Sequence, residues 1–366
     1  MRIAFLIRDL GFGGAQRQLV ALARRLPRDE FEVAVIYFYD GGLVQDLKSA
    51  GVRCILAEKK SRWDLLGFIG RLRRCLANFQ PDVVHGYLAE SNLMALLLAP
   101  WCGYPKVVWG LRDSQSDGDH WGVLGRLSAW LNQTLASRAD LIIANSQAGR
   151  DYYTQRGHPK DKTMVIPNGI DTERFVPGRN RADGDFVIGH VARLHPMKDH
   201  ETFLRALPEV FQALPNAKVR LMGAIGDATY AARMKALATE LELDEKIQWL
   251  PAQPNMERVY PQLDVVVSSS SFGEGFSNVL GEAMACGVPV IASDVGDSAR
   301  IMGNCGSSFP VKAATELAQH LITLGQSSPA WRTDLARRCR AQIVDHFSID
   351  RLVSNTCAAL QTLCTE

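Results

Sequence analysis

Short apolar runs typical of β-strands alternate with longer amphipathic segments typical of helices along most of this chain. This alternation constrains the fold more than any other feature, because a β-α-β order places successive strands parallel and joins them by right-handed crossovers. In the first half we predict strands at residues 3–7, 32–37, 53–56, 83–84, 107–109 and 141–144, and helices at 15–26, 43–50, 63–79 and 91–98.

The alternation breaks where proline, glycine and charged residues cluster, from Val165 to Asp171 and again from Pro177 to Asp185. A second alternation follows, with strands predicted at residues 186–191, 219–222, 247–250, 265–268 and 288–292. We therefore predict an α/β protein of two Rossmann-like, doubly wound domains. The first covers residues 1–168, the second covers 169–345, and a C-terminal helix over 346–366 returns to the first domain. Ligands bind at the carboxyl ends of such strands, so the two domains should face a shared interdomain cleft.

Length and composition exclude several classes of protein. A chain of 366 residues fits two ordinary domains, and 47% apolar with 22% charged residues indicates a globular protein. The sequence has no run of about eighteen apolar residues, and its first residues read as a strand rather than a signal peptide. The eight cysteines include no Cys-x-x-Cys pair, which predicts reduced thiols, mostly buried, in the cytoplasm.

The net charge of +2 is unevenly divided along the chain. Residues 1–179 hold 24 Lys and Arg against 18 Asp and Glu, whereas the remainder holds 17 against 21. The basic first half predicts an anionic partner, either a membrane surface or a phosphate-bearing acceptor, and we expect no nucleic acid.

The strongest motif reads as a strand, a glycine-rich turn, a short helix and another strand, from Ser268 to Val290. Glycines in the turn allow the backbone to approach a ligand closely, and free N–H groups at a helix start bind phosphate. We predict that the diphosphate of a ligand binds here, and the residues expected to hold it are Gly275, Phe276, Ser277 and Asn278.

Two glutamates in this motif, Glu274 and Glu282, are eight positions apart. One can reach a transferred sugar while the other accepts hydrogen bonds from the two hydroxyls of a ribose. In the alternative interpretation the motif has no ligand: Glu282 is an exposed helix residue and the glycines only turn the chain.

A second motif follows the strand predicted at residues 186–191 and contains Arg193 and Lys198. Two fixed cations at a strand end can stabilise the negative charge that develops when a nucleotide diphosphate leaves. Solvated surface charges are the alternative interpretation.

The segment Glu274–Val290 resembles the paired-glutamate signature of glycosyltransferase family 4, whose members are retaining enzymes of GT-B fold. The resemblance spans nearly the whole chain. It implies that Arg193 and Lys198 hold the donor diphosphate, and that the loop Gly11–Gln16, with Gly13 and Gly14, approaches the donor phosphate and the acceptor. It also implies an interdomain junction at Val165–Asp171.

One departure from the family concerns the strand predicted at residues 107–109. Many members carry a histidine after this strand, where it contacts the donor sugar or the acceptor, but this chain has Arg112 nearby. Arg112 can take that place, and His85 at another strand end can face the site or be structural.

Two Asp-x-Asp patterns, at residues 117–119 and 183–185, match the metal-binding pair of another glycosyltransferase fold. Neither follows a predicted strand, and Arg193 with Lys198 would make a metal unnecessary. We predict no metal and no other cofactor, the nucleotide-diphosphate sugar being a substrate.

Peripheral membrane contact is suggested by the helix predicted at residues 63–79. Trp63, Leu66, Ile69, Leu72 and Leu76 share one face, with arginines elsewhere. Such a helix can lie on an anionic membrane, but covering the sheet is the favoured role of its apolar face. A second candidate spans residues 120–131.

These observations predict a metal-independent retaining glycosyltransferase of the hexosyltransferase type. It would move a sugar from a UDP- or GDP-sugar to a glycan or lipid-linked glycan in envelope polysaccharide biosynthesis, at the inner face of the cell membrane. Arg193, Lys198 and Glu274 would be catalytic. A nucleotide-sugar epimerase of the same fold, or a catalytically silent sugar-nucleotide-binding subunit, are the alternatives.

Overall fold

The computed structural model describes residues 1–61, 63–114, 123–178 and 184–365. The chain divides into two compact units, each built on its own parallel sheet. The N-terminal unit comprises Met1–Gly169 and Ile349–Glu366, and the C-terminal unit comprises Ile170–Ser348. The prediction of two doubly wound α/β domains is confirmed by the two sheets.

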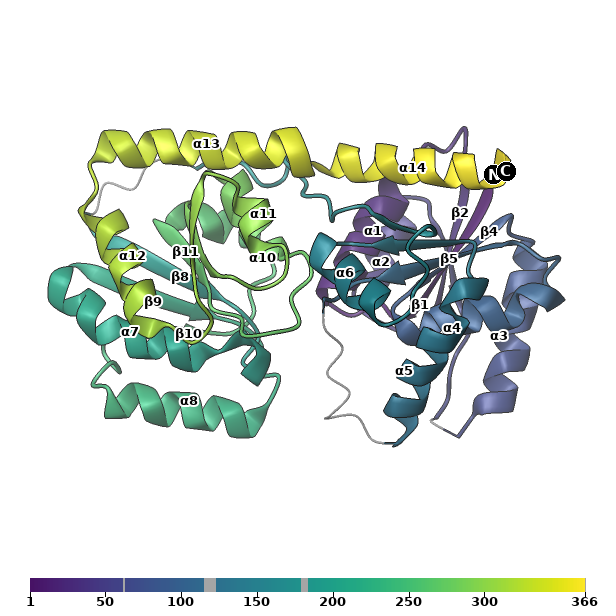
Figure 1. The fold of residues 1–366 in the computed structure, drawn as a ribbon, viewed down its shortest axis with the longest axis horizontal. Helices are drawn as coiled ribbons and strands as arrows, with labels where there is room; N and C mark the ends of the chain where they lie inside the picture. The colour runs from purple at the N-terminus through teal and green to yellow at the C-terminus, as the bar shows by residue number, and fades with distance from the viewer. Residues whose placement is uncertain (62, 115–122, 179–183, 366) are drawn as a thin grey trace. The chain divides into compact units, whose positions relative to one another are not determined.

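The N-terminal unit contains a seven-stranded sheet in the order β3-β2-β1-β4-β5-β6-β7 (Figure 1). All its strand pairs are parallel, and the direction of winding reverses between β1 and β4. The strands are β1 (Arg2–Asp9), β2 (Glu32–Tyr39), β3 (Arg53–Leu56), β4 (Val83–Tyr87), β5 (Lys106–Leu111), β6 (Leu141–Ala144) and β7 (Thr163–Val165).

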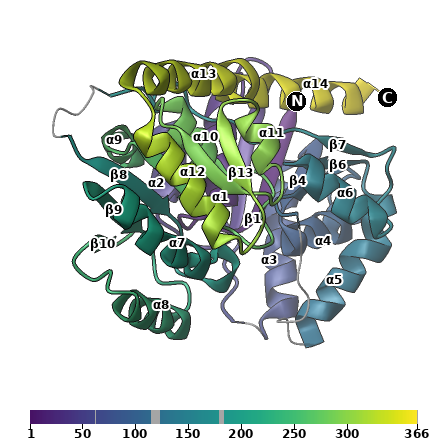
Figure 2. The same ribbon diagram turned by 60° about the vertical axis from the view of Figure 1, so that its left-hand side comes forward.

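Helices cover both faces of this sheet because alternate residues of β1 point to opposite sides. Ile3 and Phe5 share a core with residues of α1 and α14, whereas Ala4 and Leu6 share one with α3 and α4. Figures 1 and 2 both show α14 beside the N-terminus. The helices are α1 (Gly14–Arg25), α2 (Val44–Ser49), α3 (Leu65–Phe79), α4 (Ala89–Leu98), α5 (Val123–Leu135), α6 (Gln147–Gln155) and α14 (Ile349–Thr365), with 3-10 turns η1 (Ala99–Trp101) and η3 (Ala136–Arg138).

The C-terminal unit contains a six-stranded parallel sheet in the order β10-β9-β8-β11-β12-β13, with winding that reverses between β8 and β11. Its strands are β8 (Phe186–Val191), β9 (Ala217–Met222), β10 (Ile247–Leu250), β11 (Val265–Ser268), β12 (Val290–Ser293) and β13 (Gly306–Phe309). Its helices are α7 (His200–Ala213), α8 (Ala228–Glu240), α9 (Met256–Val259), α10 (Asn278–Ala285), α11 (Ser298–Met302), α12 (Ala314–Gln326) and α13 (Pro329–Phe347), with 3-10 turns η4 (Pro196–Lys198) and η5 (Tyr260–Gln262).

Helix α3 differs from its prediction in which side chains it buries. Leu72 and Leu76 are buried as a sheet-covering face requires, together with Phe68. Trp63 and Leu66, which were assigned to the same face, are 78% and 86% exposed. The helix begins at Leu65, so Trp63 precedes it, and Leu66 in the first turn lies off the face that buries Phe68, Leu72 and Leu76.

The cysteines are less buried than predicted. Cys286, Cys305 and Cys339 are buried, Cys364 is exposed and the other four are half-buried. Among the described residues, no helix has the length and apolar character needed to cross a bilayer.

Candidate functional site

The loops after β8 and β11 meet at the carboxyl edge of the C-terminal sheet, where its winding reverses. In a doubly wound sheet such a point is the usual ligand site. The first loop carries Arg193 and Lys198, and the second carries Glu274. The fold therefore brings these three predicted catalytic residues to one edge.

Lys198 and Glu274 contact each other directly. The Lys198 ammonium forms a salt bridge with Glu274 Oε1, and Ser270 Oγ donates to the same oxygen at 3.0 Å. Burial alone would raise the pKa of Glu274, but the charge and hydrogen bond of Lys198, the Ser270 bond and the charge of Arg193 together lower it. Glu274 is therefore an anion held between cations, while Arg193 itself is exposed.

Lys198 is positioned by residues that sequence reasoning did not single out. Ser269 Oγ lies 3.0 Å from the carbonyl oxygens of Lys198 and Asp199, and 2.9 Å from His190 Nε2. Asp199 adopts a left-handed conformation with φ of 43° and caps α7. The His190 and His200 rings lie 4.7 Å apart. The only signal in the sequence was the proximity of His190 to Arg193.

Burial keeps both histidines neutral. It lowers the pKa of His200 to about 4 and holds that of His190 well below its ordinary value, and the Lys198 charge acts in the same direction on each. The uncharged rings therefore add no positive charge near Lys198.

Glu282 lies on α10, and its Oε2 accepts a hydrogen bond of 3.0 Å from the hydroxyl of Tyr260. Tyr260 is fully buried in η5, so the phenol fixes the carboxylate from the core side. No sequence pattern indicated this pair, because the two residues are 22 positions apart on different elements.

The glycine-rich turn before α10 lies tightly against the loop after β12. The N–H of Asp297 donates to the carbonyl of Gly275 at 3.1 Å. Gly296 has a φ of 62°, and a Cβ there would lie 2.1 Å from the carbonyl oxygen of Glu274. Phe276 and Ser277 are buried, and Ser277 and Asn278 are the N-cap and first residue of α10.

In the N-terminal unit, the loop after β1 is closed by side chains on either side. Asp9 Oδ1 accepts from the N–H of Gly11 at 3.0 Å and from Gln16 Nε2 at 3.1 Å. Gly13 caps α1 and Gly14 begins it. A Cβ on Gly13 would lie 2.2 Å from Gln16 Oε1, so glycine allows this closure.

His85 and Arg112 lie near each other around Tyr87 at the carboxyl ends of β4 and β5. The Arg112 guanidinium stacks on the Tyr87 ring at 4.1 Å, and the His85 ring lies 4.8 Å from the same ring. Burial, aided by the Arg112 charge, holds the pKa of His85 well below its ordinary value. Neither ring nitrogen of His85 has a hydrogen-bond partner among the described residues.

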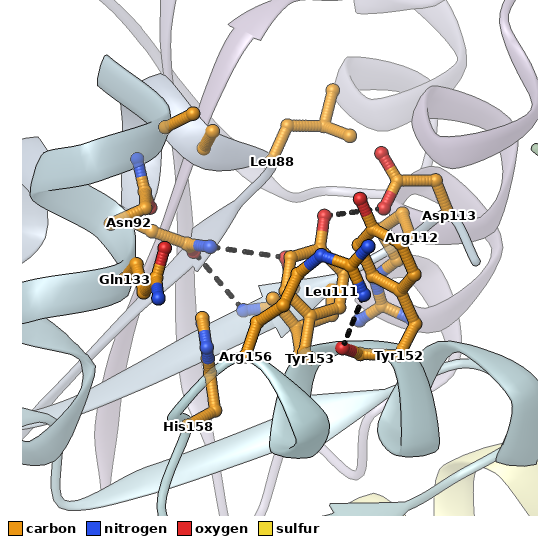
Figure 3. A pocket seen from close by; sticks show the side chains of 14 residues that line it. Leu88, Asn92, Leu111, Arg112, Asp113, Gln133, Tyr152, Tyr153, Arg156 and His158 are labelled. Atoms are coloured by element: carbon orange, nitrogen blue, oxygen red, sulfur yellow. Dashed lines mark hydrogen bonds between the residues drawn. The ribbon is translucent and has the colours of Figure 1, made fainter. Parts of the chain in front are cut away.

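Arg112 also lines a cavity of about 200 Å³ within this unit, beyond the end of β5 (Figure 3). Side chains from α4, α5 and α6 complete its wall. Sequence reasoning did not predict this cavity.

The prediction that the protein binds no metal is not tested by the structure. The Asp117–Asp119 pattern and Asp183 lie outside the described residues. Asp185 forms a salt bridge of 2.5 Å with Lys218. Within the part of the chain that the structure describes, His, Cys, Asp and Glu side chains form no group of three suited to a metal.

Two family models match the chain in succession. Glycosyltransferase Family 4 matches residues 12–174, and Glycosyl transferases group 1 matches residues 171–342. The chain is 24% identical to the glycosyltransferase EpsF of Bacillus subtilis, over 80% of this chain and 79% of that protein. It is 29% identical to the D-inositol 3-phosphate glycosyltransferase of Segniliparus rotundus, over 73% of this chain and 61% of that protein.

Solved structures with the same fold cover the whole chain. Anabaena HepE, solved in complex with UDP and glucose, superposes with a TM-score of 0.85 at 23% identity, over 99% of both chains. At this identity the likeness establishes the fold.

Proposed function

Since the chain belongs to the glycosyltransferases of GT-B fold, with a family 4 model matching its N-terminal half and a group 1 model its C-terminal half, we propose that it transfers a hexosyl unit from a UDP- or GDP-sugar with retention at the anomeric carbon. The acceptor is a glycan or a lipid-linked glycan of envelope polysaccharide biosynthesis. EpsF and the D-inositol 3-phosphate glycosyltransferase are named as transferases, and HepE was solved with UDP, which supports this choice of donor.

The observation that carries the proposal is the Lys198–Glu274 pair at the reversal point of the C-terminal sheet. Departure of a nucleotide diphosphate develops negative charge, which Lys198 and the nearby Arg193 neutralise. Glu274 accepts hydrogen bonds from the transferred sugar. We propose that the reaction follows a front-face route. The acceptor oxygen bonds to the anomeric carbon on the same face from which the phosphate leaves, and the leaving phosphate oxygen takes the proton of the acceptor hydroxyl.

The nucleotide is held by α10 and its preceding turn. Glu282, fixed by Tyr260, accepts from the ribose hydroxyls. The backbone N–H groups at the start of α10, with Gly275, bind the diphosphate. Arg193 and Lys198 supply the positive charge that a divalent metal would otherwise provide, so the reaction needs no metal.

We also propose that the protein contacts the inner face of an anionic membrane through the start of α3. Trp63, Leu65 and Leu66 are exposed apolar side chains at the start of α3, next to Lys59 and Lys60 in the sequence. Exposed aromatic and aliphatic groups beside lysines are suited to a peripheral contact with lipid headgroups.

The test is calorimetric titration of UDP and GDP without added metal, on the wild type and on Glu282→Ala. We expect one nucleotide to bind and the variant to lose at least about 10-fold in affinity, since it removes charge-assisted hydrogen bonds. Glu209→Ala, an exposed glutamate on α7, is the matched control and should bind as the wild type. Binding of neither nucleotide would overturn the proposal. Nucleotide binding without sugar transfer to any glycan would favour the silent subunit.

A further inference from the structure

The cavity beyond β5 belongs wholly to the N-terminal unit and is separate from the predicted nucleotide-binding residues on the other sheet. Figure 3 shows side chains on two opposite sides of this cavity. Asn92, Gln133 and His158 lie on one side, and Arg112, Asp113 and Tyr152 lie on the other. Its volume of about 200 Å³ suits one sugar unit rather than a chain of them.

Two arginines give the cavity positive charge. The Arg156 guanidinium stacks on the Tyr152 ring at 3.6 Å and donates to the Tyr152 carbonyl at 3.3 Å. Arg112 stacks on Tyr87. Over residues 1–61, 63–114, 123–178 and 184–365, neither guanidinium has a carboxylate at ion-pair distance. Stacked guanidiniums keep their N–H edges available, and these edges match a planar carboxylate.

His158 supplies unused hydrogen-bonding capacity on the opposite wall. It is 5% exposed, and neither ring nitrogen has a hydrogen-bond partner among the residues described. Burial lowers its pKa to about 4, so the ring is neutral and offers one donor and one acceptor. Leaving such groups buried and unpaired costs free energy, and the hydroxyls of a sugar would satisfy them.

Asp113 adds an acceptor that is held in place. The Tyr153 hydroxyl donates to Asp113 Oδ1 at 2.6 Å. Burial raises the pKa of Asp113 despite this bond. With two arginines and one aspartate, the cavity carries a formal charge of +1 when the aspartate is ionised, which one carboxylate would neutralise.

We propose that this cavity binds a carboxylate-bearing pyranose, a hexuronic acid unit of the acceptor glycan. Arg156 and Arg112 bind the carboxylate, and His158 and Asp113 bind ring hydroxyls. The inference rests on the proposed function, because it treats the occupant as part of the acceptor. It makes an acidic polysaccharide the substrate class.

The test uses the full chain and three probes in ligand-observed NMR titrations: D-glucuronate, D-glucose and glucose 6-phosphate. We expect glucuronate to bind at least about 10-fold more tightly than glucose, as a charge-assisted bond implies. Arg156→Gln should weaken glucuronate binding by about 10- to 100-fold and remove that preference. Arg156→Lys, which keeps the charge but not the planar fork, should retain part of it.

Arg138→Gln is the matched control, since Arg138 is an exposed arginine of the same unit on η3, outside the cavity lining. It should bind glucuronate as the wild type does. Equal affinity for glucuronate and glucose, or an equal loss in Arg138→Gln, would overturn the inference. Tighter binding of glucose 6-phosphate than of glucuronate would also overturn it, by assigning the arginines to phosphate.

Nucleotide titration of the same samples separates this inference from the proposed function. A chain that binds UDP or GDP but shows no preference for glucuronate contradicts the cavity assignment alone. A chain that prefers glucuronate but binds neither nucleotide contradicts the proposed function alone, and leaves a sugar-acid site.

Discussion

Charged side chains at the carboxyl edges of the two sheets differ in the partners that they contact. In the C-terminal unit the groups are paired with one another, Lys198 with Glu274 and Glu282 with Tyr260. In the N-terminal unit Arg112 and Arg156, which line the cavity, lie on tyrosine faces and have no carboxylate at ion-pair distance among the described residues. The first arrangement fixes its geometry before any ligand arrives. The second leaves guanidinium donors for a ligand to satisfy.

This difference fits a division of labour between a constant and a variable substrate. The ribose and diphosphate are the same in UDP- and GDP-sugars, so the groups that bind them can be held in advance at little loss of versatility. A glycan acceptor differs from one enzyme to the next. Buried groups without a partner cost about 1–3 kcal/mol each, which a ligand returns when it binds.

The largest effect is expected from a substitution of Lys198 that removes its salt bridge with Glu274. Lys198→Ala should lower the turnover of the donor sugar by about 10²–10³, as expected for loss of one preorganised charge. The measurement is the rate of nucleotide release from the donor, and nucleotide affinity reports whether the unit remains folded. Lys235→Ala, an exposed lysine on α8, should retain the wild-type rate. Full turnover in Lys198→Ala would make the salt bridge purely structural.

Acid should weaken both units through buried neutral histidines, His85 and His158 in the N-terminal unit and His190 and His200 in the C-terminal unit. Burial lowers the pKa of His158 and of His200 to about 4, while the unfolded chain takes up these protons below about 6.5. Stability is therefore constant above about pH 6.5 and is lost as the pH falls from 6.5 to 4, by about 2 kcal/mol per histidine at pH 5. Chemical denaturation at pH 7 and pH 5 measures the loss.

His158→Gln and His200→Gln each remove one of these titrating histidines, one from each unit. The first should reduce the acid sensitivity of the N-terminal unit and the second that of the C-terminal unit. An unchanged difference between pH 7 and pH 5 in both variants would mean that other groups set the acid response.

The smallest expected effect concerns the phenol that fixes Glu282. Tyr260→Phe keeps the buried ring but removes one hydrogen bond, so nucleotide affinity should fall by about 2- to 10-fold. Calorimetry with the nucleotide that the wild type binds gives the value. Tyr104→Phe, on a 78% exposed tyrosine, is the matched control. A loss as large as that of Glu282→Ala would mean that the carboxylate cannot keep its position without the phenol.

The fold could be predicted from the sequence because strand and helix periods alternate so regularly. Runs such as Ile3–Ile7 and Phe186–Val191 bury nearly every residue, which leaves a continuous apolar signal. The edge strands β3 and β10 were predicted, but the edge strands β7 and β13 were not. β7 has three residues, and β13 reads Gly-Ser-Ser-Phe, so neither carries an apolar run.

The candidate site was predictable only where its residues lie close together in the sequence. The Glu274–Glu282 segment and the Arg193–Lys198 segment could each be found locally, and the pairing of β8 with β11 brings them to one edge. Contacts between distant residues left no pattern. Tyr153 with Asp113 is separated by 40 positions, and His190 with Ser269 by 79. The roles proposed for these residues stay predictions until they are measured.

The chain passes from the N-terminal unit to the other at Gly169 and returns at Ile349. The N–H of Ile170 donates to the Phe347 carbonyl at 2.8 Å, and a Cβ on Gly169 would lie 2.7 Å from the Ile349 Cα. The C-terminal unit is therefore an uninterrupted stretch inserted into its neighbour. During synthesis, residues 170–348 are complete before α14 emerges, so the unit that begins first is the last to acquire all its parts.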